Sequence, residues 1–241
     1  MATALVVGCT GLIGSHILSI LRTGASPSQY SSVNTIARRS LPAAAESESE
    51  SAVPVNEVLE KDTTKWGEHI AALSPPPSAV FYALGTTRAA VGGFENQNKI
   101  EHEMNLQVAK AAKEAGTKTY VLISSAGASA GSMFGYPKMK GEIEDIVKAL
   151  EFEHTIIVRP GLIVGEREQS RGVLEVGLRS FANGLGHLHH SLKDSWAQDA
   201  ETIARASVAA AAMAEKGEVK DKVWVLAQKD VVRLGKTEWK A

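Results

Sequence analysis

Cysteine is nearly absent from this sequence, and its absence excludes one way of stabilising a fold. Cys9 is the single cysteine among 241 residues. No disulfide framework can form, which indicates a reducing compartment, and a chain of this length can instead bury a sizeable core. Cys9 lies inside a glycine-rich turn, where a small packed residue is a simpler interpretation than a redox switch.

An excess of charge of one sign and a long apolar segment are also missing. The chain carries 26 Lys and Arg against 27 Asp and Glu, a formal net charge of -1. Without a basic footprint, we expect no nucleic-acid partner. The longest apolar candidate, residues 207–214, is an alanine-rich helix face far shorter than the roughly 18 residues that span a bilayer. Because the N-terminus enters a strand within a few residues, we also expect no cleaved presequence.

The sequence opens with a strand, a glycine turn and a helix. Residues 4–7 form a short apolar run, glycines follow at positions 8, 11 and 14, and helical periodicity continues to Thr23. In a dinucleotide-binding fold, the first glycine permits the sharp turn, the second lets the backbone approach a pyrophosphate, and the third lets the helix pack closely. The phosphates lie at the helix N-terminus, where free N–H groups favour an anion. We therefore expect cofactor contacts from Gly8, Thr10, Gly11, Leu12, Ile13 and Gly14.

The end of the second predicted strand, residues 33–37, indicates which dinucleotide binds. Arg38 and Arg39 follow this strand directly. At this point an acid usually contacts the ribose 2′-hydroxyl of NAD, whereas a cation accommodates the 2′-phosphate of NADP. Two arginines without an acid favour NADP(H), and the alternative is that adjacent basic residues simply belong to an exposed loop.

Strands and helices alternate through the rest of the chain to about residue 160. Strands are predicted at 56–62, 79–84, 120–123 and 154–158, and helices at 66–73, about 96–115 and about 136–150. This alternation specifies an α/β fold, a Rossmann-type doubly wound parallel sheet. The helix at 96–115 is expected to form its apolar side from Ile100, Met104, Leu106, Val108 and Ala112.

Ligands of an open parallel sheet bind at the carboxyl ends of its strands. On that ground we expect further cofactor contacts from Leu84, Gly85, Thr86 and Pro160. Residues 1–160 are interpreted as an NADP-binding Rossmann core, and residues 161–241 as a small C-terminal substrate lobe packed on the same domain. In that lobe we predict helices at 173–182 and 199–216 and a last strand at 223–226.

Tyr136 and Lys140 are candidate catalytic residues because side chains four apart on a helix share a face. A tyrosine ordinarily ionises near pH 10, and a neighbouring ammonium stabilises the phenolate and brings its pKa closer to neutral pH. The lysine can also hydrogen-bond the nicotinamide ribose. Ser125, or its neighbour Ser124, could hold a substrate carbonyl oxygen while Tyr136 donates a proton and the nicotinamide donates hydride.

These motifs together resemble the atypical short-chain dehydrogenases/reductases related to the mammalian Tat-interacting protein, and most of all the fungal FMP branch of the mitochondrial surface. The G-x-x-G-x-x-G spacing is typical of that superfamily. The resemblance covers nearly the whole chain and rests on residues 8–14, 84–88, 124–127, 136–142, 159–161 and 194–197.

The resemblance implies NADP(H) binding and a contact of Asp62 with the adenine. It also implies a peripheral location on the cytosolic face of the mitochondrial outer membrane. The sequence departs from the superfamily pattern in a Ser- and Glu-rich insertion at 43–51 and in Pro137, which directly follows the tyrosine. Since proline is accepted in the first turn of a helix, we expect Tyr136 at the N-cap.

Two functions are open on these residues. The first is an NADP(H)-dependent oxidoreductase that reduces a small carbonyl compound or, in reverse, oxidises the corresponding alcohol. The alternative is a protein that binds NADPH as a sensor or regulator, or docks a partner, with little or no turnover. A metal site at His187, His189 and His190 is not favoured, because no cysteine or carboxylate completes a recognisable spacing. The sequence sets no oligomeric state.

Overall fold

A seven-stranded parallel sheet is the centre of the structure, a computed structural model that describes residues 2–23, 30–41, 52–86, 88–164 and 197–240. The strand order is β3-β2-β1-β4-β5-β6-β9, and every neighbouring pair in the sheet is parallel. The strands are β1 (Thr3–Val7), β2 (Ser32–Ala37), β3 (Val55–Leu59), β4 (Ala79–Tyr82), β5 (Thr119–Ile123), β6 (His154–Val158) and β9 (Val223–Leu226). The predicted Rossmann-type sheet is thereby confirmed.

The central strands are apolar along their whole length because helices cover both faces of the sheet. Every residue of β1, β4 and β5 is buried, whereas the two edge strands, β3 and β9, keep several exposed positions. Side chains that alternate along one strand therefore enter two different cores. In β1, Ala4 and Val6 join one core, and Leu5 and Val7 join the other.

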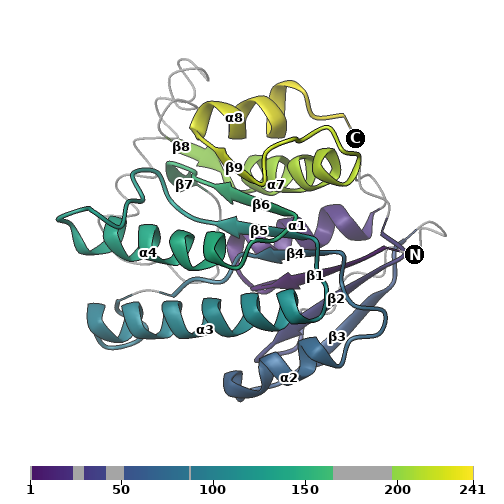
Figure 1. Ribbon diagram of the computed structural model, residues 1–241, viewed down its shortest axis with the longest axis horizontal. Helices are drawn as coiled ribbons and strands as arrows, with labels where there is room; N and C mark the ends of the chain where they lie inside the picture. Colours follow the sequence, from purple (N-terminus) through teal and green to yellow (C-terminus); the bar gives the residue numbers. More distant parts are fainter. Residues whose placement is uncertain (1, 24–29, 42–51, 87, 165–196, 241) are drawn as a thin grey trace.

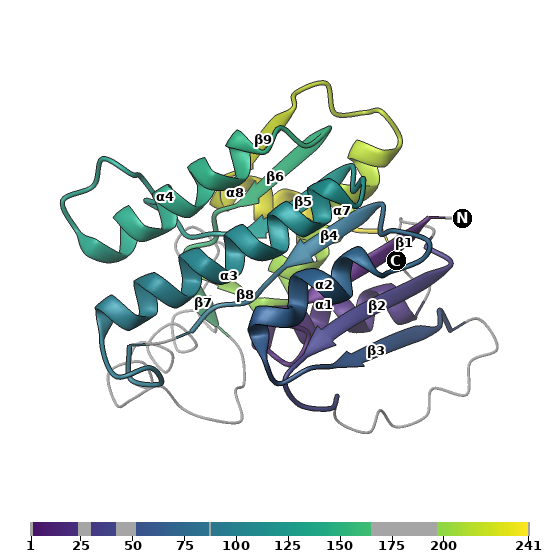
Figure 2. The same ribbon diagram turned by 60° about the horizontal axis from the view of Figure 1, so that its bottom comes forward.

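The helices form one layer on each face of the sheet, as Figures 1 and 2 show. One layer contains α1 and α7, which pack on each other, and the other contains α2, α3 and α4. The helices are α1 (Leu12–Arg22), α2 (Trp66–Ala71), α3 (Phe94–Glu114), α4 (Gly135–Ala149), α7 (Ala200–Glu215) and α8 (Gln228–Val232), with a 3₁₀ turn at Thr63–Lys65 and a π-helical turn at Arg233–Thr237.

The C-terminal segment completes the sheet and its helical layer. Helix α7 packs on α1, and β9 pairs with β6 as the seventh strand. A separate two-stranded parallel sheet joins β7 (Leu162–Val164) to β8 (Ala197–Asp199), neither of which the sequence indicated. Residues 165–196, which include the predicted helix at 173–182, lie outside the described residues, as does the insertion at 43–51. The proposed substrate lobe therefore stays a prediction.

Helix α4 begins earlier than the sequence indicated, so the expected N-cap position of Tyr136 is wrong. Phe134 is the N-cap, and Tyr136 is the second residue of the helix. Pro137 follows as the third residue, still inside the first turn, where its missing N–H leaves no intrahelical bond unmade.

The first half of α3 also buries a different face from the predicted one. Gln97, Glu101 and Asn105 are 4%, 3% and 0% exposed, whereas the expected Ile100 and Met104 are only half-buried. This polar stripe continues, further along the helix, into the buried apolar residues Val108 and Ala112. Of the predicted apolar residues, Val108 and Ala112 are thus buried in the core and Met104 packs against it, whereas Ile100 and Leu106 are only half-buried.

Candidate nucleotide-binding and catalytic site

The glycine turn after β1 lies against the end of β4. Gly8 has a φ of +89°, and a Cβ atom there would lie 2.7 Å from the Leu84 amide nitrogen and 2.8 Å from the Ala83 carbonyl carbon. At Gly14, the first turn of α1 packs so closely that a Cβ atom would overlap the Gly8 carbonyl oxygen. Only glycine therefore fits at either position, as the dinucleotide pattern requires.

The N-terminus of α1 is open to an anion. Gly11 is the N-cap, no side chain caps the helix, and the first turn contains no acidic residue. The first intrahelical bond runs from the Ser15 N–H to the Gly11 oxygen at 2.9 Å, so the N–H groups of Leu12 and Ile13 have no intrahelical acceptor. Free amides and the positive end of the helix dipole suit a diphosphate, so this turn fits the expected dinucleotide.

Cys9, inside the turn, packs into the core. Its side chain is 1% exposed, and burial raises the pKa of its thiol to about 11. Because the thiolate is the reactive form of cysteine, this environment favours the packing role over a redox switch.

Arg38 and Arg39 are exposed immediately after β2, and neither forms an ion pair with a described residue. The chain beyond them is anchored, since the Leu41 N–H donates to Glu57 at 2.8 Å. Asp62, the expected adenine contact, instead uses its Oδ1 to accept from the N–H and hydroxyl of Thr64 at 3.0 and 2.6 Å. These bonds lower the pKa of the Asp62 carboxyl, and its contact with a nucleotide stays a prediction.

The loop that follows β4 is held by the polar stripe of α3. The Thr86 N–H donates to Glu101 Oε1 at 3.2 Å, and Gln97 Nε2 donates to the Thr86 carbonyl oxygen at 2.9 Å. Leu84 and Gly85 lie between this anchor and the end of β4, and the Leu84 backbone lies beside the glycine turn. On the other side of β5, the Ala126 N–H donates to the Pro160 carbonyl oxygen at 2.8 Å and ties the ends of β5 and β6 together.

Tyr136 and Lys140 share a face of α4, as their spacing predicted. The Lys140 Nζ lies 5.9 Å from the centroid of the Tyr136 ring. The tyrosine is 38% exposed, whereas the lysine is 8% exposed and its Nζ donates to Glu101 Oε2 at 2.7 Å. The site thus places a buried cation, paired with a buried anion, next to an accessible phenol.

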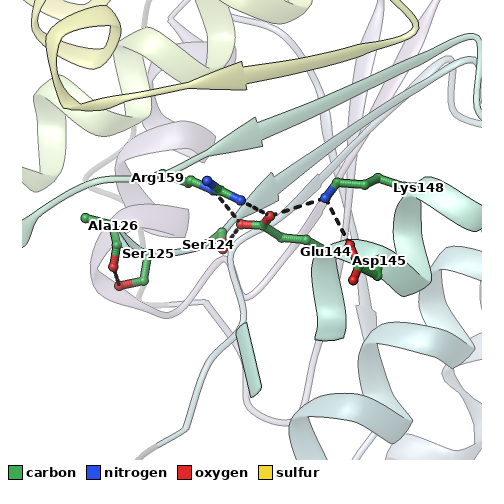
Figure 3. A network of polar contacts seen from close by, with 7 residues as sticks. All are labelled: Ser124, Ser125, Ala126, Glu144, Asp145, Lys148 and Arg159. Atoms are coloured by element: carbon green, nitrogen blue, oxygen red, sulfur yellow. Dashed lines mark hydrogen bonds and ion pairs between the residues drawn. The ribbon is translucent and has the colours of Figure 1, made fainter. Parts of the chain in front are cut away.

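The two serines after β5 have different surroundings, which Figure 3 shows. The Ser124 hydroxyl donates to Glu144 Oε1 at 2.6 Å, and the Arg159 guanidinium binds the same fully buried carboxylate through two nitrogens. This pairing raises the pKa of Arg159. Among the described residues, Ser125 makes only a long contact of 3.4 Å with the Ala126 oxygen. The Ser124 hydroxyl is therefore occupied by Glu144, and Ser125 is the serine whose hydroxyl is available to a ligand.

A cavity of about 530 Å³ lies along the flank of α4 that carries this network. Glu144, Lys148 and Arg159 line it, together with the loop at 128–131, but Ser125, Tyr136 and Lys140 do not. Of the predicted site residues, Tyr136 and Lys140 lie together, and Glu101 links Lys140 to the loop that contains Thr86. Ser125 and Tyr136 form no hydrogen bond with each other.

Sequence reasoning missed Glu101 and Glu144, the two buried carboxylates that hold the site residues. Glu101 could have been found from the spacing of Gln97, Glu101 and Asn105, which share one helix face at four-residue steps. Glu144 stands four residues after Lys140 on α4, but nothing in the sequence indicated that Arg159 would reach it.

The described residues contain no cluster of three or more His, Cys, Asp or Glu side chains that could hold a metal ion. The three histidines at 187, 189 and 190 lie outside them. In the same described part of the chain, no helix is both long enough and apolar enough to cross a membrane.

The fold, the glycine turn and the Tyr-Lys helix define a nucleotide-binding α/β protein of the short-chain dehydrogenase type, and the sequence comparisons agree. A model of the NAD dependent epimerase/dehydratase family matches residues 4–225, so the chain belongs to this family.

Relatives place it more narrowly. The chain is 51% identical to the protein fmp52-1, mitochondrial, of Aspergillus terreus over 239 residues, which cover 98% of this chain and 100% of that protein. It is 47% identical to the protein fmp-52, mitochondrial, of Neurospora crassa over 99% of this chain and 97% of that protein. The predicted place in the FMP branch of atypical short-chain dehydrogenases/reductases is confirmed.

Solved structures share the fold at low sequence identity. A UDP-N-acetylglucosamine 4-epimerase from Methanobrevibacter ruminantium matches with a TM-score of 0.63 and 16% identity, over 93% of this chain and 75% of that one. MoeE5 in complex with UDP-glucuronic acid and NAD matches with a TM-score of 0.60 and 17% identity, over 94% of this chain and 75% of that one.

Proposed function

We propose that this protein is an oxidoreductase that uses NADP(H) to reduce a small carbonyl compound, or to oxidise the corresponding alcohol. Ser125, Tyr136 and Lys140 are the proposed catalytic residues. The observation that carries this proposal is the contrast within the Tyr-Lys pair: Lys140 is 8% exposed and Tyr136 is 38% exposed. A buried ammonium beside an accessible phenol suits proton transfer to a bound substrate.

Family membership and NAD in the MoeE5 structure support a nicotinamide dinucleotide as the cofactor. Its diphosphate is proposed to bind the open N–H groups of Leu12 and Ile13 at the start of α1. The exposed Arg38 and Arg39, which follow β2 without an acidic residue, are proposed to bind the 2′-phosphate and so to select NADP(H).

The bound nicotinamide supplies the hydride, and the protein supplies the proton and the geometry. In the reduction, the Ser125 hydroxyl donates a hydrogen bond to the carbonyl oxygen, and the Tyr136 phenol transfers its proton to that oxygen as the carbon becomes an alcohol carbon. The Lys140 ammonium stabilises the negative charge left on the phenol and hydrogen-bonds the nicotinamide ribose. In the oxidation, Tyr136 accepts the alcohol proton.

The location is part of the same proposal. The Aspergillus terreus and Neurospora crassa relatives are named mitochondrial, which supports a mitochondrial location for this chain. We place it peripherally on the cytosolic face of the outer membrane. Protease treatment of intact mitochondria tests this placement: the protein is expected to be degraded, and protection until the outer membrane is ruptured would contradict it.

The test of the activity is NADPH consumption with a panel of aldehydes and ketones. Wild-type protein should oxidise NADPH with at least one member of the panel, and Tyr136→Phe, which keeps the ring but lacks the phenol, should not. NADPH that binds tightly to both proteins while neither oxidises it would favour the alternative function, an NADPH sensor or regulatory protein.

A further inference from the structure

Glu101 is a buried charge at the centre of the proposed site, and it belongs to none of the roles assigned so far. It is 3% exposed, and its Oε2 accepts from the Lys140 Nζ at 2.7 Å. Its Oε1 accepts from the Thr86 N–H at 3.2 Å and from Gln97 Nε2 at 3.1 Å. One carboxylate thus joins α3, α4 and the loop after β4.

The carboxylate affects the catalytic pair in two ways. It fixes the lysine ammonium at one point, because a charge-assisted hydrogen bond in a buried position is strong and directional. It also offsets the lysine charge, so the phenol beside Lys140 is exposed to a nearly neutral pair in place of a lone cation. One phenol on β4 lies in the field of Glu101: burial raises the pKa of Tyr82, and the Glu101 charge raises it further.

We propose that Glu101 is a positioning residue that holds Lys140 beside Tyr136 and sets how readily the Tyr136 phenol loses its proton. The inference rests on the proposed function, in which that phenol is the proton donor. A tyrosine that retains its proton at the working pH can donate it in the reduction, whereas a lone buried lysine would favour the phenolate.

In the part of the chain that the structure describes, few other titratable groups surround this pair. From β4, the buried Tyr82 lies in the field of the Glu101 charge, and its hydroxyl interacts with the Asn105 side chain of α3. From α3 and α4, His102 and Glu142 form a second interhelical pair at 3.4 Å, and neither contacts Lys140. Glu144, on α4, is engaged with Ser124 and Arg159. From β5, Tyr120 is fully buried behind Tyr82.

The chain allows a direct readout of Tyr136 without nucleotide or substrate. It contains four tyrosines, of which Tyr30, Tyr82 and Tyr120 are at most 5% exposed. Burial raises the pKa of Tyr82 and of Tyr120 far above the usual range, and the Tyr30 hydroxyl donates to Glu215 at 2.7 Å. The first rise of tyrosinate absorbance near 295 nm on alkaline titration is therefore assigned to Tyr136, and Tyr136→Phe should remove it.

The pH midpoint of this absorbance rise is expected to move in opposite directions when Glu101 and when Lys140 is replaced. Glu101→Gln keeps the shape and the Thr86 bond but removes the negative charge, so the absorbance rise should shift to lower pH. The Lys140 Nζ lies 2.7 Å from Glu101 Oε2 and 5.9 Å from the Tyr136 ring centroid, so the Glu101 charge is within about 9 Å of the ring. A unit charge at that distance shifts the midpoint by about one pH unit. Lys140→Met leaves the carboxylate unpaired and should shift the rise to higher pH.

Two further variants separate this role from a merely structural one. His102→Gln breaks a neighbouring α3–α4 pair without touching Lys140, and its absorbance midpoint should equal that of the wild type. The double variant Glu101→Gln/Lys140→Met leaves no unpaired buried charge. If Glu101→Gln alone does not fold, the double variant should still ionise about one pH unit below Lys140→Met.

Equal midpoints for wild type and Glu101→Gln, or for Lys140→Met and the double variant, would overturn the proposal. This outcome is independent of the proposed reaction, because no cofactor is present in the titration. A shifted midpoint in a protein that turns over no carbonyl would retain the role of Glu101 on Tyr136 and reject the reductase function alone.

Discussion

Gly8→Ala tests how closely the glycine turn packs against the strand beside it, and the structure gives two separate costs for the added methyl group. The first is conformational: a φ of +89° is unfavourable for alanine by about 1–2 kcal/mol. The second is steric, because the new Cβ would lie within 2.9 Å of three backbone atoms of Ala83 and Leu84. Overpacking of this kind costs about 1–3 kcal/mol, so the free energy of unfolding should fall by about 2–5 kcal/mol in total.

Gly116 provides a matched control. Its φ is +90°, but a Cβ atom there would have no heavy-atom neighbour within 4 Å, so Gly116→Ala should lose only the conformational part. Urea unfolding of both variants measures the difference, which should be about 1–3 kcal/mol. The thermal stabilisation by NADPH should also be lost in Gly8→Ala and kept in Gly116→Ala. Equal losses of stability in the two variants would refute the close packing of the turn against β4.

Three other predictions concern the second strand, the buried network and the turn thiol. Arg38→Asp should weaken NADPH binding by about 10- to 100-fold, which corresponds to the loss of one charge-assisted hydrogen bond, and should change NADH binding little. Equal losses of affinity for the two nucleotides in a fluorescence titration would show that Arg38 does not bind the 2′-phosphate. Glu144→Gln should lower the unfolding free energy by about 2–3 kcal/mol, since Arg159 is partly exposed and the full cost of a broken buried pair is not reached. Because burial raises the pKa of Cys9 from 9.0 to about 11, the unfolded chain loses the thiol proton first, and stability present below pH 9 should fall by about 2–3 kcal/mol as the pH rises to 11. Cys9→Ala should lack this loss of stability between pH 9 and 11. Identical profiles of stability against pH for the variant and the wild type would show that Cys9 does not cause the loss.

The sheet could be predicted because local signals and long-range packing agree in it. The runs at 79–84 and 120–123 are apolar without interruption, as strands covered on both faces must be, and each is followed by small polar residues at the binding edge. The glycines of the first turn were equally readable, since their spacing reflects backbone contacts that no other residue permits.

The polar interior of the site could not be predicted in the same way. The helix spacing of Glu101 shows a polar face, but the charge of Glu101 is buried beside Lys140, which is thirty-nine residues further along the chain and donates to it. A helix pattern carries no information about such a partner. Periodicity therefore placed the apolar Ile100 on the inward face, which Glu101 occupies in the structure. The same limit applies to Glu144, whose burial depends on Arg159 at the end of another strand.

The most direct test of the account follows the hydride itself. Wild-type protein is incubated with NADPH that carries deuterium at C4 of the nicotinamide and with the aldehydes and ketones of the panel, and the products are analysed by mass spectrometry. Deuterium is expected on the carbinol carbon of an alcohol product for the wild type and in no product for Tyr136→Phe. Tight NADPH binding without a labelled alcohol from any carbonyl, or equal labelling by the two proteins, would contradict the proposed function.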